Sequence, residues 1–231
     1  MIFRQLFDVD SSTYTYLIAD EITREALFID AVKNRLNTYL QLLRELDVKL
    51  IKAIDTHVHA DHVTALGDLR DATGCITLMG EQSSAPCVNE RFADGDMIGI
   101  GALKLQAMYT PGHTDDSYSF YLQADNRGYV FTGDTLLIRG SGRTDFQSGS
   151  ADAQYDSLFN KLLTLPENTV VYPGHDYKGW TSSSIGEEKH HNPRLQVKNK
   201  EAYIELMNNL KLPHPQLMDI AVPANQACGK S

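Results

Sequence analysis

The sequence has 231 residues, of which 42% are hydrophobic and 22% are charged, a composition typical of a globular protein with a substantial core. Its formal net charge of -9 argues against a nucleic-acid surface, because phosphate contacts need clustered Lys and Arg. No apolar run approaches the roughly 20 residues that span a bilayer, and the N-terminus, with Arg4, Asp8 and Asp10, lacks the apolar stretch of a signal peptide.

The first part of the chain predicts strands followed by a helix. Strands are expected at residues 2–6, 14–19 and 25–30, where β-branched, aromatic and apolar residues gather. A helix is expected near residues 34–46, because Leu36, Leu40 and Leu43 lie on one face at helical spacing.

The next stretch is the most informative one in the sequence. Residues 48–55 predict a buried strand, and residues 63–70 have helical spacing up to Gly74, which is expected to end that helix. Between them lies Thr-His-Val-His-Ala-Asp-His, residues 56–62, which we name the His-rich loop. A polar helix entrance with incidental histidines is the alternative. However, the loop holds three of the chain's eight histidines, and its four metal-capable side chains favour a transition-metal site.

The rest of the chain alternates strands, turns and helices. Short strands and turns are expected over residues 75–105, with a turn at residues 94–96, and further strands at residues 104–110, 117–122, 129–132 and 169–172. A helix is expected where Tyr155, Leu158, Leu162 and Leu165 share one face, and another near residues 196–210, before a Pro-containing tail. Because no linker or internal repeat divides the chain, we expect one domain over residues 1–231.

Four predicted strands each end in a loop that carries His or Asp. They lead to the His-rich loop, His113, Asp134 and His175, and a Gly directly precedes each of the last three residues. A lone histidine is more often a core or surface residue than a ligand. Four strand ends with the same arrangement predict one shared site.

The three cysteines, Cys75, Cys87 and Cys228, form an odd and scattered set without a Cys-x-x-Cys pair. They predict no disulfide framework and a reducing compartment, most simply the cytoplasm. No basic residue adjoins any of them, so we expect packing or surface positions and no catalytic role.

His-x-His-x-Asp-His followed by Gly-His, Gly-Asp and Gly-His resembles the metallo-β-lactamase superfamily over essentially the whole chain. The resemblance implies an α/β fold, an αββα sandwich with a metal site at one edge of two facing sheets. Residues 131–140, 142–147, 185–189 and 192–195 resemble the persulfide dioxygenase family within it. Ser141 departs from that family, which has Cys there, at a position that is not a metal ligand in the family.

The persulfide dioxygenase resemblance implies that His57, His113 and Asp134 bind one Fe(II). Two imidazoles and a carboxylate form a facial triad that leaves iron positions open for a sulfur anion and O2. The same resemblance implies that His59, Asp61, His62 and His175 act by holding those ligands and water through hydrogen bonds. These four residues could also complete a binuclear site, as in the glyoxalase II thioester hydrolases, whose C-terminal extension is longer.

The family's substrate is glutathione persulfide, which O2 oxidises to sulfite and glutathione. Arg143, Tyr177 and Arg194 are the expected contacts, because guanidinium groups suit the carboxylates of glutathione. Internal salt bridges for the two arginines and a packed aromatic for Tyr177 are the alternatives. The sequence does not fix the oligomeric state, and a homodimer is the expectation. The second functional hypothesis is a binuclear glutathione-thioester hydrolase, and a non-catalytic binding module is the third.

Overall fold

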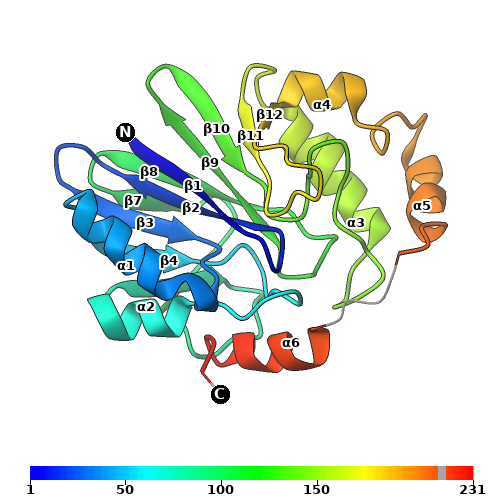
Figure 1. Ribbon diagram of the computed structural model, residues 1–231. Coiled ribbons are helices and arrows are strands. Elements are labelled where there is room, and N and C mark those ends of the chain that lie inside the picture. Colours follow the sequence, from blue (N-terminus) through cyan, green and yellow to red (C-terminus); the bar gives the residue numbers. More distant parts are fainter. Residues whose placement is uncertain (213–216, 231) are drawn as a thin grey trace.

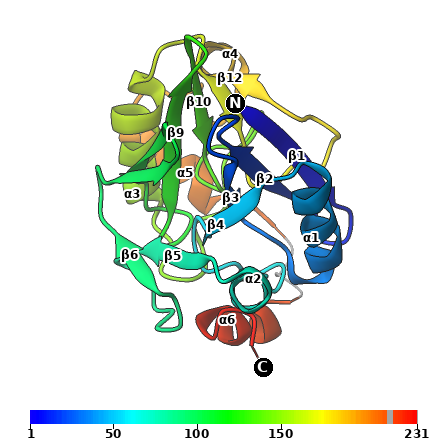
Figure 2. The same cartoon turned by 90° about the vertical axis from the view of Figure 1, so that its left-hand side faces the viewer.

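The computed structural model describes residues 1–212 and 217–230, which form two facing six-stranded sheets (Figures 1 and 2). The first sheet contains β1 (Ile2–Asp8), β2 (Thr13–Ala19), β3 (Glu25–Ile29), β4 (Lys49–Ile54), β5 (Ile76–Gly80) and β6 (Glu90–Phe92) in that order. The second contains, in order, β12 (Ser183–Ser184), β11 (Val170–Tyr172), β10 (Arg127–Phe131), β9 (Tyr118–Ala124), β8 (Leu103–Tyr109) and β7 (Met97–Ile100).

Helices cover the outer faces of both sheets. They are α1 (Leu36–Glu45), α2 (Leu66–Thr73), α3 (Ala151–Asp156), α4 (Ile185–His191), α5 (Lys200–Asn208) and α6 (Met218–Gln226), with short turns η1 (Lys33–Arg35), η2 (Ser157–Lys161) and η3 (Leu162–Thr164). Figure 2 shows α1 and α3 on opposite sides of the two sheets. The predicted αββα sandwich is therefore confirmed. In the part of the chain that the structure describes, no helix has the length and apolar character needed to cross a membrane.

Strand β2 shows why the sequence folds into layers. Its side chains alternate between two apolar environments: Tyr16 and Ile18 belong to the core between the sheets, whereas Leu17 and Ala19 belong to the core beneath α1 and α2. All seven residues of β2 are buried. A strand covered on both faces needs apolar side chains at successive positions, which is the pattern of this segment.

Most of the predicted elements are present, with shifted ends. Gly74 ends α2 in the left-handed conformation, at φ 74°, as its position predicted. The helix expected around residues 155–165 begins as α3 and continues through the π-type turn η2 and the 3₁₀ turn η3. The helix expected from residue 196 begins only at Lys200, where the Asn199 side chain accepts a hydrogen bond from the backbone N–H of Ala202.

Two predictions about the C-terminus are wrong. The helix near residues 196–210 was expected to be the terminal one, but the Pro-containing tail after it includes helix α6, which has Pro223 inside it. The expectation of no disulfide also fails, because α6 brings Cys228 to Cys87, 141 positions earlier, and the two are bonded. Only Cys75 is a free thiol, and it is buried as expected. The disulfide removes the cysteine argument for a reducing compartment.

The fold brings the predicted strand ends to one edge of the sandwich. Strands β10 and β11 are parallel neighbours, so the loops that follow them leave the sheet side by side. Gly174 N donates to Gly133 O at 2.8 Å, which joins these two loops, and Tyr14 N in β2 of the other sheet donates to Gly174 O at 2.8 Å. The two sheets are thereby fixed to each other beside the site.

The core between the sheets should dominate stability. Leu27 is 0% exposed in β3, so Leu27→Ala should lower the free energy of unfolding by about 2–5 kcal/mol through lost burial and a cavity. Ile22→Ala is the control, since Ile22 is 90% exposed and its truncation should change stability by less than about 0.5 kcal/mol. Urea unfolding of both variants measures this, and equal losses would contradict the packing described.

Candidate metal centre

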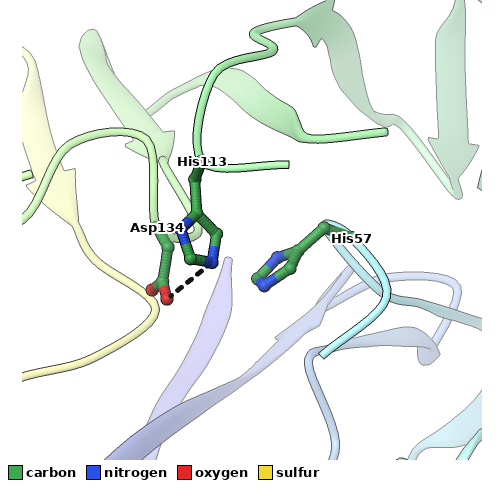
Figure 3. A group of neighbouring side chains, drawn as sticks. All are labelled: His57, His113 and Asp134. Carbon is green, nitrogen blue, oxygen red and sulfur yellow. Dashed lines mark ion pairs between the residues drawn. The ribbon is translucent and has the colours of Figure 1, made fainter. Parts of the chain in front are cut away.

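Three side chains from three different loops converge at the edge of the sandwich (Figure 3). His57 follows β4, His113 follows β8 and Asp134 follows β10, and one possible ligand atom from each lies within 4.8 Å of the others. His113 Nε2 lies 3.5 Å from Asp134 Oδ2. Ligands held at about 2.1 Å from an ion and at right angles to one another lie about 3 Å apart, so small movements would suit a metal.

Hydrogen bonds leave the Nε2 atoms of both histidines available. His113 Nδ1 lies 2.8 Å from the carbonyl oxygen of Arg143, which can only accept, so the proton is on Nδ1. The Thr56 hydroxyl donates to Asp30 and therefore accepts from His57 Nδ1, at 2.9 Å. The lone pairs on both Nε2 atoms remain free for a metal, which fits the three-residue group.

Electrostatics favour the charge states that metal binding requires. Burial, together with the neighbouring His59 and His113, holds the pKa of His57 well below its ordinary value, so its imidazole is neutral. Burial alone would raise the pKa of Asp134. The charge and hydrogen bond of His175, with His113 and His57 nearby, outweigh that effect and lower the pKa of this carboxyl, which is therefore ionised.

Asp30 organises the start of the His-rich loop. This 1%-exposed carboxylate accepts hydrogen bonds from Thr56 N at 2.7 Å and from the Thr56 hydroxyl at 3.0 Å. His59 Nε2 lies 3.1 Å from Oδ1 of the same carboxylate, the oxygen that also accepts from Thr56 N. Burial lowers the pKa of His59, but the charge and hydrogen bond of Asp30 outweigh it and raise that pKa to about 9. His59 is thus engaged by Asp30 on its Nε2 side.

His175 lies between two carboxylates. Its Nδ1 is 2.6 Å from Asp134 Oδ1, and its Nε2 is 2.8 Å from Asp61 Oδ2. Burial opposes a charge here, but the two carboxylates together hold the pKa of His175 well above its ordinary value. An imidazolium that donates from both nitrogens has no lone pair for a metal. In this arrangement His175 is placed to hold the Asp134 carboxylate by a hydrogen bond.

A second group of donors lies beside the first. Possible ligand atoms of His59, Asp61 and His62 lie within 4.8 Å of one another. His59 Nδ1 and His62 Nε2 are buried and have no hydrogen-bond partner among the described residues. Burial lowers the pKa of His62, so its Nε2 is free for a second ion, whereas His59, with its raised pKa, would first have to release a proton. The binuclear alternative therefore keeps a structural basis mainly through His62.

The glycines before Asp134 and His175 lie where neighbouring atoms leave no room for a side chain. Gly133 has φ 48°, and a Cβ on it would lie 2.7 Å from the Thr56 hydroxyl oxygen. A Cβ on Gly174 would lie 2.8 Å from Asp134 Oδ1. A larger residue at either position would push the loops apart, as the Gly-Asp and Gly-His pairs predicted.

A cavity of about 480 Å³ opens over the metal group. Its lining includes His113, Asp134 and His175 and all three predicted substrate contacts, Arg143, Tyr177 and Arg194. The same cavity is therefore lined by residues of the candidate metal centre and by the predicted substrate contacts.

The three substrate candidates differ in their surroundings. Arg143 forms a two-point ion pair with Asp145, at 2.7 and 2.8 Å, which is the salt bridge considered as its alternative role. Arg194 donates to the Ser141 carbonyl at 2.9 Å, and no ion pair to it is present among the described residues. Tyr177 is 73% exposed and stacks on His175, so it is not a packed core aromatic.

Several residues that support the site were missed by the sequence analysis. Asp30 ends β3, the neighbour of β4, so the strand-end rule could have found it. Thr13 places its hydroxyl 3.1 Å from both Asp61 and His175, and Asp116 accepts a hydrogen bond from Val58 N at 3.1 Å. Asn225 binds the His-rich loop from α6. No local pattern marks the last three.

Comparison with known proteins agrees with this geometry. The family model described as Metallo-beta-lactamase superfamily matches residues 11–175. Persulfide dioxygenase ETHE1, mitochondrial, of Mus musculus is 45% identical over 230 residues, which cover 99% of this chain and 89% of that protein. The crystal structure of ETHE1 from Myxococcus xanthus matches with a TM-score of 0.96 and 55% identity, covering 100% of both chains. A probable hydroxyacylglutathione hydrolase of Schizosaccharomyces pombe is 36% identical over 170 residues, or 71% of this chain and 64% of that protein.

Removing Asp134 should affect metal binding far more than removing His175. Asp134→Ala deletes a ligand of the three-residue group, so the purified variant should lose most of its metal. His175→Ala removes only a residue that orients a ligand, and should keep most of its metal with an affinity about 10- to 100-fold lower. Elemental analysis after desalting measures both. Equal loss in the two variants would indicate a binuclear site.

Proposed function

We propose that this chain, which belongs to the metallo-β-lactamase superfamily and within it to the persulfide dioxygenases, oxidises glutathione persulfide with O2 to sulfite and glutathione. The full-length likeness to persulfide dioxygenases carries the proposal. The reaction balances as one persulfide, one O2 and one water giving one glutathione, one sulfite and two protons. The sulfur–sulfur bond breaks, and the terminal sulfur receives three oxygens.

The metal proposed for His57, His113 and Asp134 is one Fe(II) per chain. The donor set supports this choice, because two neutral imidazoles and one ionised carboxylate on one side of an ion are typical of non-haem Fe(II) oxygenases. When bound, the iron supplies positions where sulfur and O2 can exchange electrons. The chain's own contribution is to bring both Nε2 lone pairs and a negative Asp134 close together, with His113 and Asp134 lining the 480 Å³ cavity.

His175 and Asp61 support the proposal from beside the metal group. The hydrogen bond from His175 Nδ1 holds Asp134 in one orientation, and Asp61 holds the other nitrogen of the same ring. We infer that His59 and His62 act in the same way, through Asp30 and Asp61 respectively. Fixing the ligands before the substrate arrives reduces the reorganisation needed during the reaction.

Arg194 is the residue we assign to a glutathione carboxylate. Four cationic residues line the cavity: Arg139, Arg143, Lys178 and Arg194. Arg139 is paired with Glu187 and Glu188, and Arg143 is paired with Asp145. Lys178 is exposed, whereas Arg194 is half-buried, and burial lowers its pKa. A half-buried guanidinium without a carboxylate partner among the described residues is suited to an anionic ligand.

Arg143 and Tyr177 are proposed as further contacts at the cavity. The bond from His113 Nδ1 to the Arg143 carbonyl ties the Arg143 backbone to a metal ligand. Its guanidinium also lies over the Phe146 ring, 4.4 Å from the ring centroid. Tyr177 offers an exposed ring and hydroxyl next to His175. Substrate held by these groups would place its persulfide near the metal group at the same end of the cavity.

The second candidate function is hydrolysis of a glutathione thioester at a binuclear centre. The unpaired His59 Nδ1 and His62 Nε2 favour it, as does the likeness to the Schizosaccharomyces pombe hydrolase. That likeness covers less of both chains than the likeness to the mouse dioxygenase. The doubly engaged ring of His175 also argues against a second ion.

The cytoplasm and a homodimer remain our proposals for compartment and assembly. The mouse relative is described as mitochondrial, and the disulfide removes the cysteine argument made from the sequence. Cell fractionation and light scattering of the purified protein measure these two properties directly.

Truncating either arginine should weaken substrate binding without emptying the metal site. Arg194→Ala and Arg143→Ala should raise KM roughly ten- to hundredfold, because each loses a charge-assisted hydrogen bond to a carboxylate. Arg127→Ala, an exposed arginine at the start of β10, serves as the matched control and should leave KM unchanged. If KM stays constant and only Tm falls, the arginines are structural.

The reaction itself is tested with an oxygen electrode and a sulfite assay. With glutathione persulfide, the protein should consume one O2 for each sulfite formed, and with glutathione alone it should consume none. S-D-lactoylglutathione, tested with and without air, reports the hydrolase activity. Oxygen-independent thioester cleavage without persulfide-dependent O2 uptake would overturn the dioxygenase proposal.

A further inference from the structure

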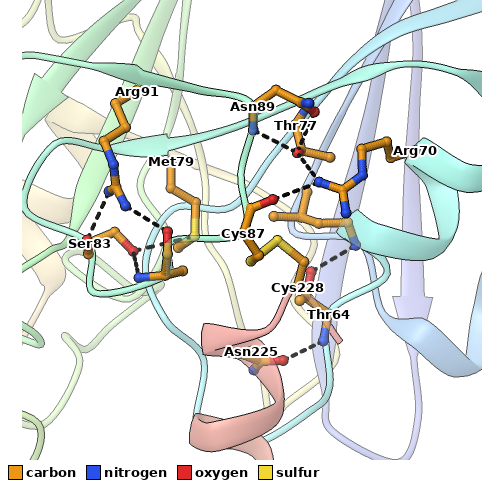
Figure 4. Close-up of a disulfide and its surroundings, with 12 residues drawn as sticks. Thr64, Arg70, Thr77, Met79, Ser83, Cys87, Asn89, Arg91, Asn225 and Cys228 are labelled. Atoms are coloured by element: carbon orange, nitrogen blue, oxygen red, sulfur yellow. Dashed lines mark hydrogen bonds between the residues drawn. A yellow bond between two sulfur atoms is a disulfide. The ribbon is translucent and has the colours of Figure 1, made fainter. Parts of the chain in front are cut away.

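One side chain of the C-terminal helix α6 spans the His-rich loop. Asn225 is 3% exposed, and its Nδ2 donates to His59 O at 2.9 Å and to His62 O at 2.8 Å. Its Oδ1 accepts from Thr64 N at 2.8 Å (Figure 4). The side-chain amide of Asn225 therefore makes three hydrogen bonds to the backbone of residues 59–64, a segment that is neither helix nor strand.

Besides Asn225, helix α6 is attached by Val222, which packs on the core beneath α1 and α2, and by Gln226, whose Nε2 donates to the Ser84 hydroxyl at 3.0 Å. Within the helix only Ala221 and Asn225 are buried, and Ile220 is 67% exposed. Pro223 lies inside the helix and has no N–H to donate. A short helix with so little buried apolar surface is weakly held by packing.

The Cys87–Cys228 disulfide supplies the missing attachment. Cys228 lies three positions after Asn225, is 1% exposed, and accepts a hydrogen bond from Gly67 N through its carbonyl at 2.9 Å. Cys87 is held in turn, because Arg70 donates to its carbonyl oxygen at 2.6 Å. Figure 4 shows the disulfide between Cys87, whose carbonyl Arg70 holds, and Cys228, just after the end of α6. The bond therefore links Asn225 to the body of the protein.

We propose that Asn225 is a positioning residue for the metal centre and that the Cys87–Cys228 disulfide makes its hold on the His-rich loop dependent on redox state. This inference rests on the metal centre of the proposed function. Oxidation would proceed by exchange with a low-molecular-weight disulfide. The sulfur–sulfur bond of the small disulfide breaks, the Cys87–Cys228 bond forms, and two electrons and two protons pass from the protein thiols to two released small thiols.

Reduction of the Cys87–Cys228 disulfide would affect the metal centre indirectly, through Asn225. With both thiols free, α6 and the residues after it keep noncovalent contacts alone: limited packing, the hydrogen bonds Gln226 to Ser84 and Gly67 N to Cys228 O, and the ion pairs of Lys230 with Asp68 and Asp71. Asn225 would then leave the loop more often, and the carbonyls of His59 and His62 would lose their donors. Because His57 lies on the same loop, its orientation toward His113 and Asp134 would become less fixed.

Hydrogen–deuterium exchange of the metal-free full-length protein tests this inference without relying on iron or on any activity. The oxidised protein, the same protein reduced with a phosphine, and the Cys87→Ser and Asn225→Ala variants are compared over residues 57–66. Ile220→Ala, an exposed change on the same helix, is the control, and β9 in the other sheet reports global stability. Exchange at Thr64 N should rise at least about tenfold in the reduced protein and in both variants.

The exchange rates distinguish a disulfide that controls the His-rich loop through Asn225 from a disulfide that stabilises only the overall fold. A rise confined to residues 57–66 and α6, absent in Ile220→Ala, supports the inference. Equal exchange in oxidised and reduced protein would overturn the redox dependence, and unchanged exchange in Asn225→Ala would overturn the role of Asn225. A uniform rise that includes β9 would also overturn it, because the bond would then stabilise only the fold.

A second readout follows the metal geometry itself. Co(II) is loaded as a probe, and its visible d–d spectrum reports the arrangement of its ligands. Asn225→Ala and Cys87→Ser should shift this spectrum and release Co(II) to a chelator at least about tenfold faster, whereas Ile220→Ala should do neither. Co(II) spectra and release rates unchanged in both variants would overturn positioning of the metal centre, even if a separate assay shows persulfide oxidation.

Discussion

The site depends on one buried carboxylate. Asp30 is almost fully removed from water, a position that costs free energy unless the charge is matched by hydrogen bonds. It receives them from the backbone and hydroxyl of Thr56 and from His59, all at the start of the His-rich loop. The same Thr56 hydroxyl sets the tautomer of His57. A loop without regular structure is thereby held in one conformation by the end of the neighbouring strand.

The polar groups around the centre divide into two kinds. His57 and His113 have one nitrogen occupied by an acceptor and the other directed to a common point, which is the state of a metal ligand. His175 has both nitrogens occupied by carboxylates, which is the state of a residue that orients others. Histidines of the same sequence motifs therefore differ in which ring nitrogens remain free, because their hydrogen-bond partners differ.

The strand-end pattern predicted the residues of the centre, since apolar strands followed by Gly-His or Gly-Asp place those side chains at one edge of a sheet. The two-sheet fold came from the family resemblance and not from periodicity. What could not be predicted depends on contacts between distant segments. The helix near residues 196–210 was expected to be the terminal one, so helix α6, the Asn225 contacts and the Cys87–Cys228 bond were not foreseen. Arg143 pairs with Asp145, whereas Arg194 donates to the Ser141 carbonyl. The sequence could not predict this difference, because it depends on how the loops fold around the cavity.

The central claim is that one metal ion is bound by His57, His113 and Asp134 while His175 remains bound to two carboxylates. Anomalous diffraction from crystals of the protein purified without chelators, recorded on both sides of the iron edge, tests it most directly. The account predicts one iron peak per chain, bonded to His57 Nε2, His113 Nε2 and Asp134. Two metal peaks per chain, the second bonded to residues among His59, Asp61, His62 and His175, would contradict it.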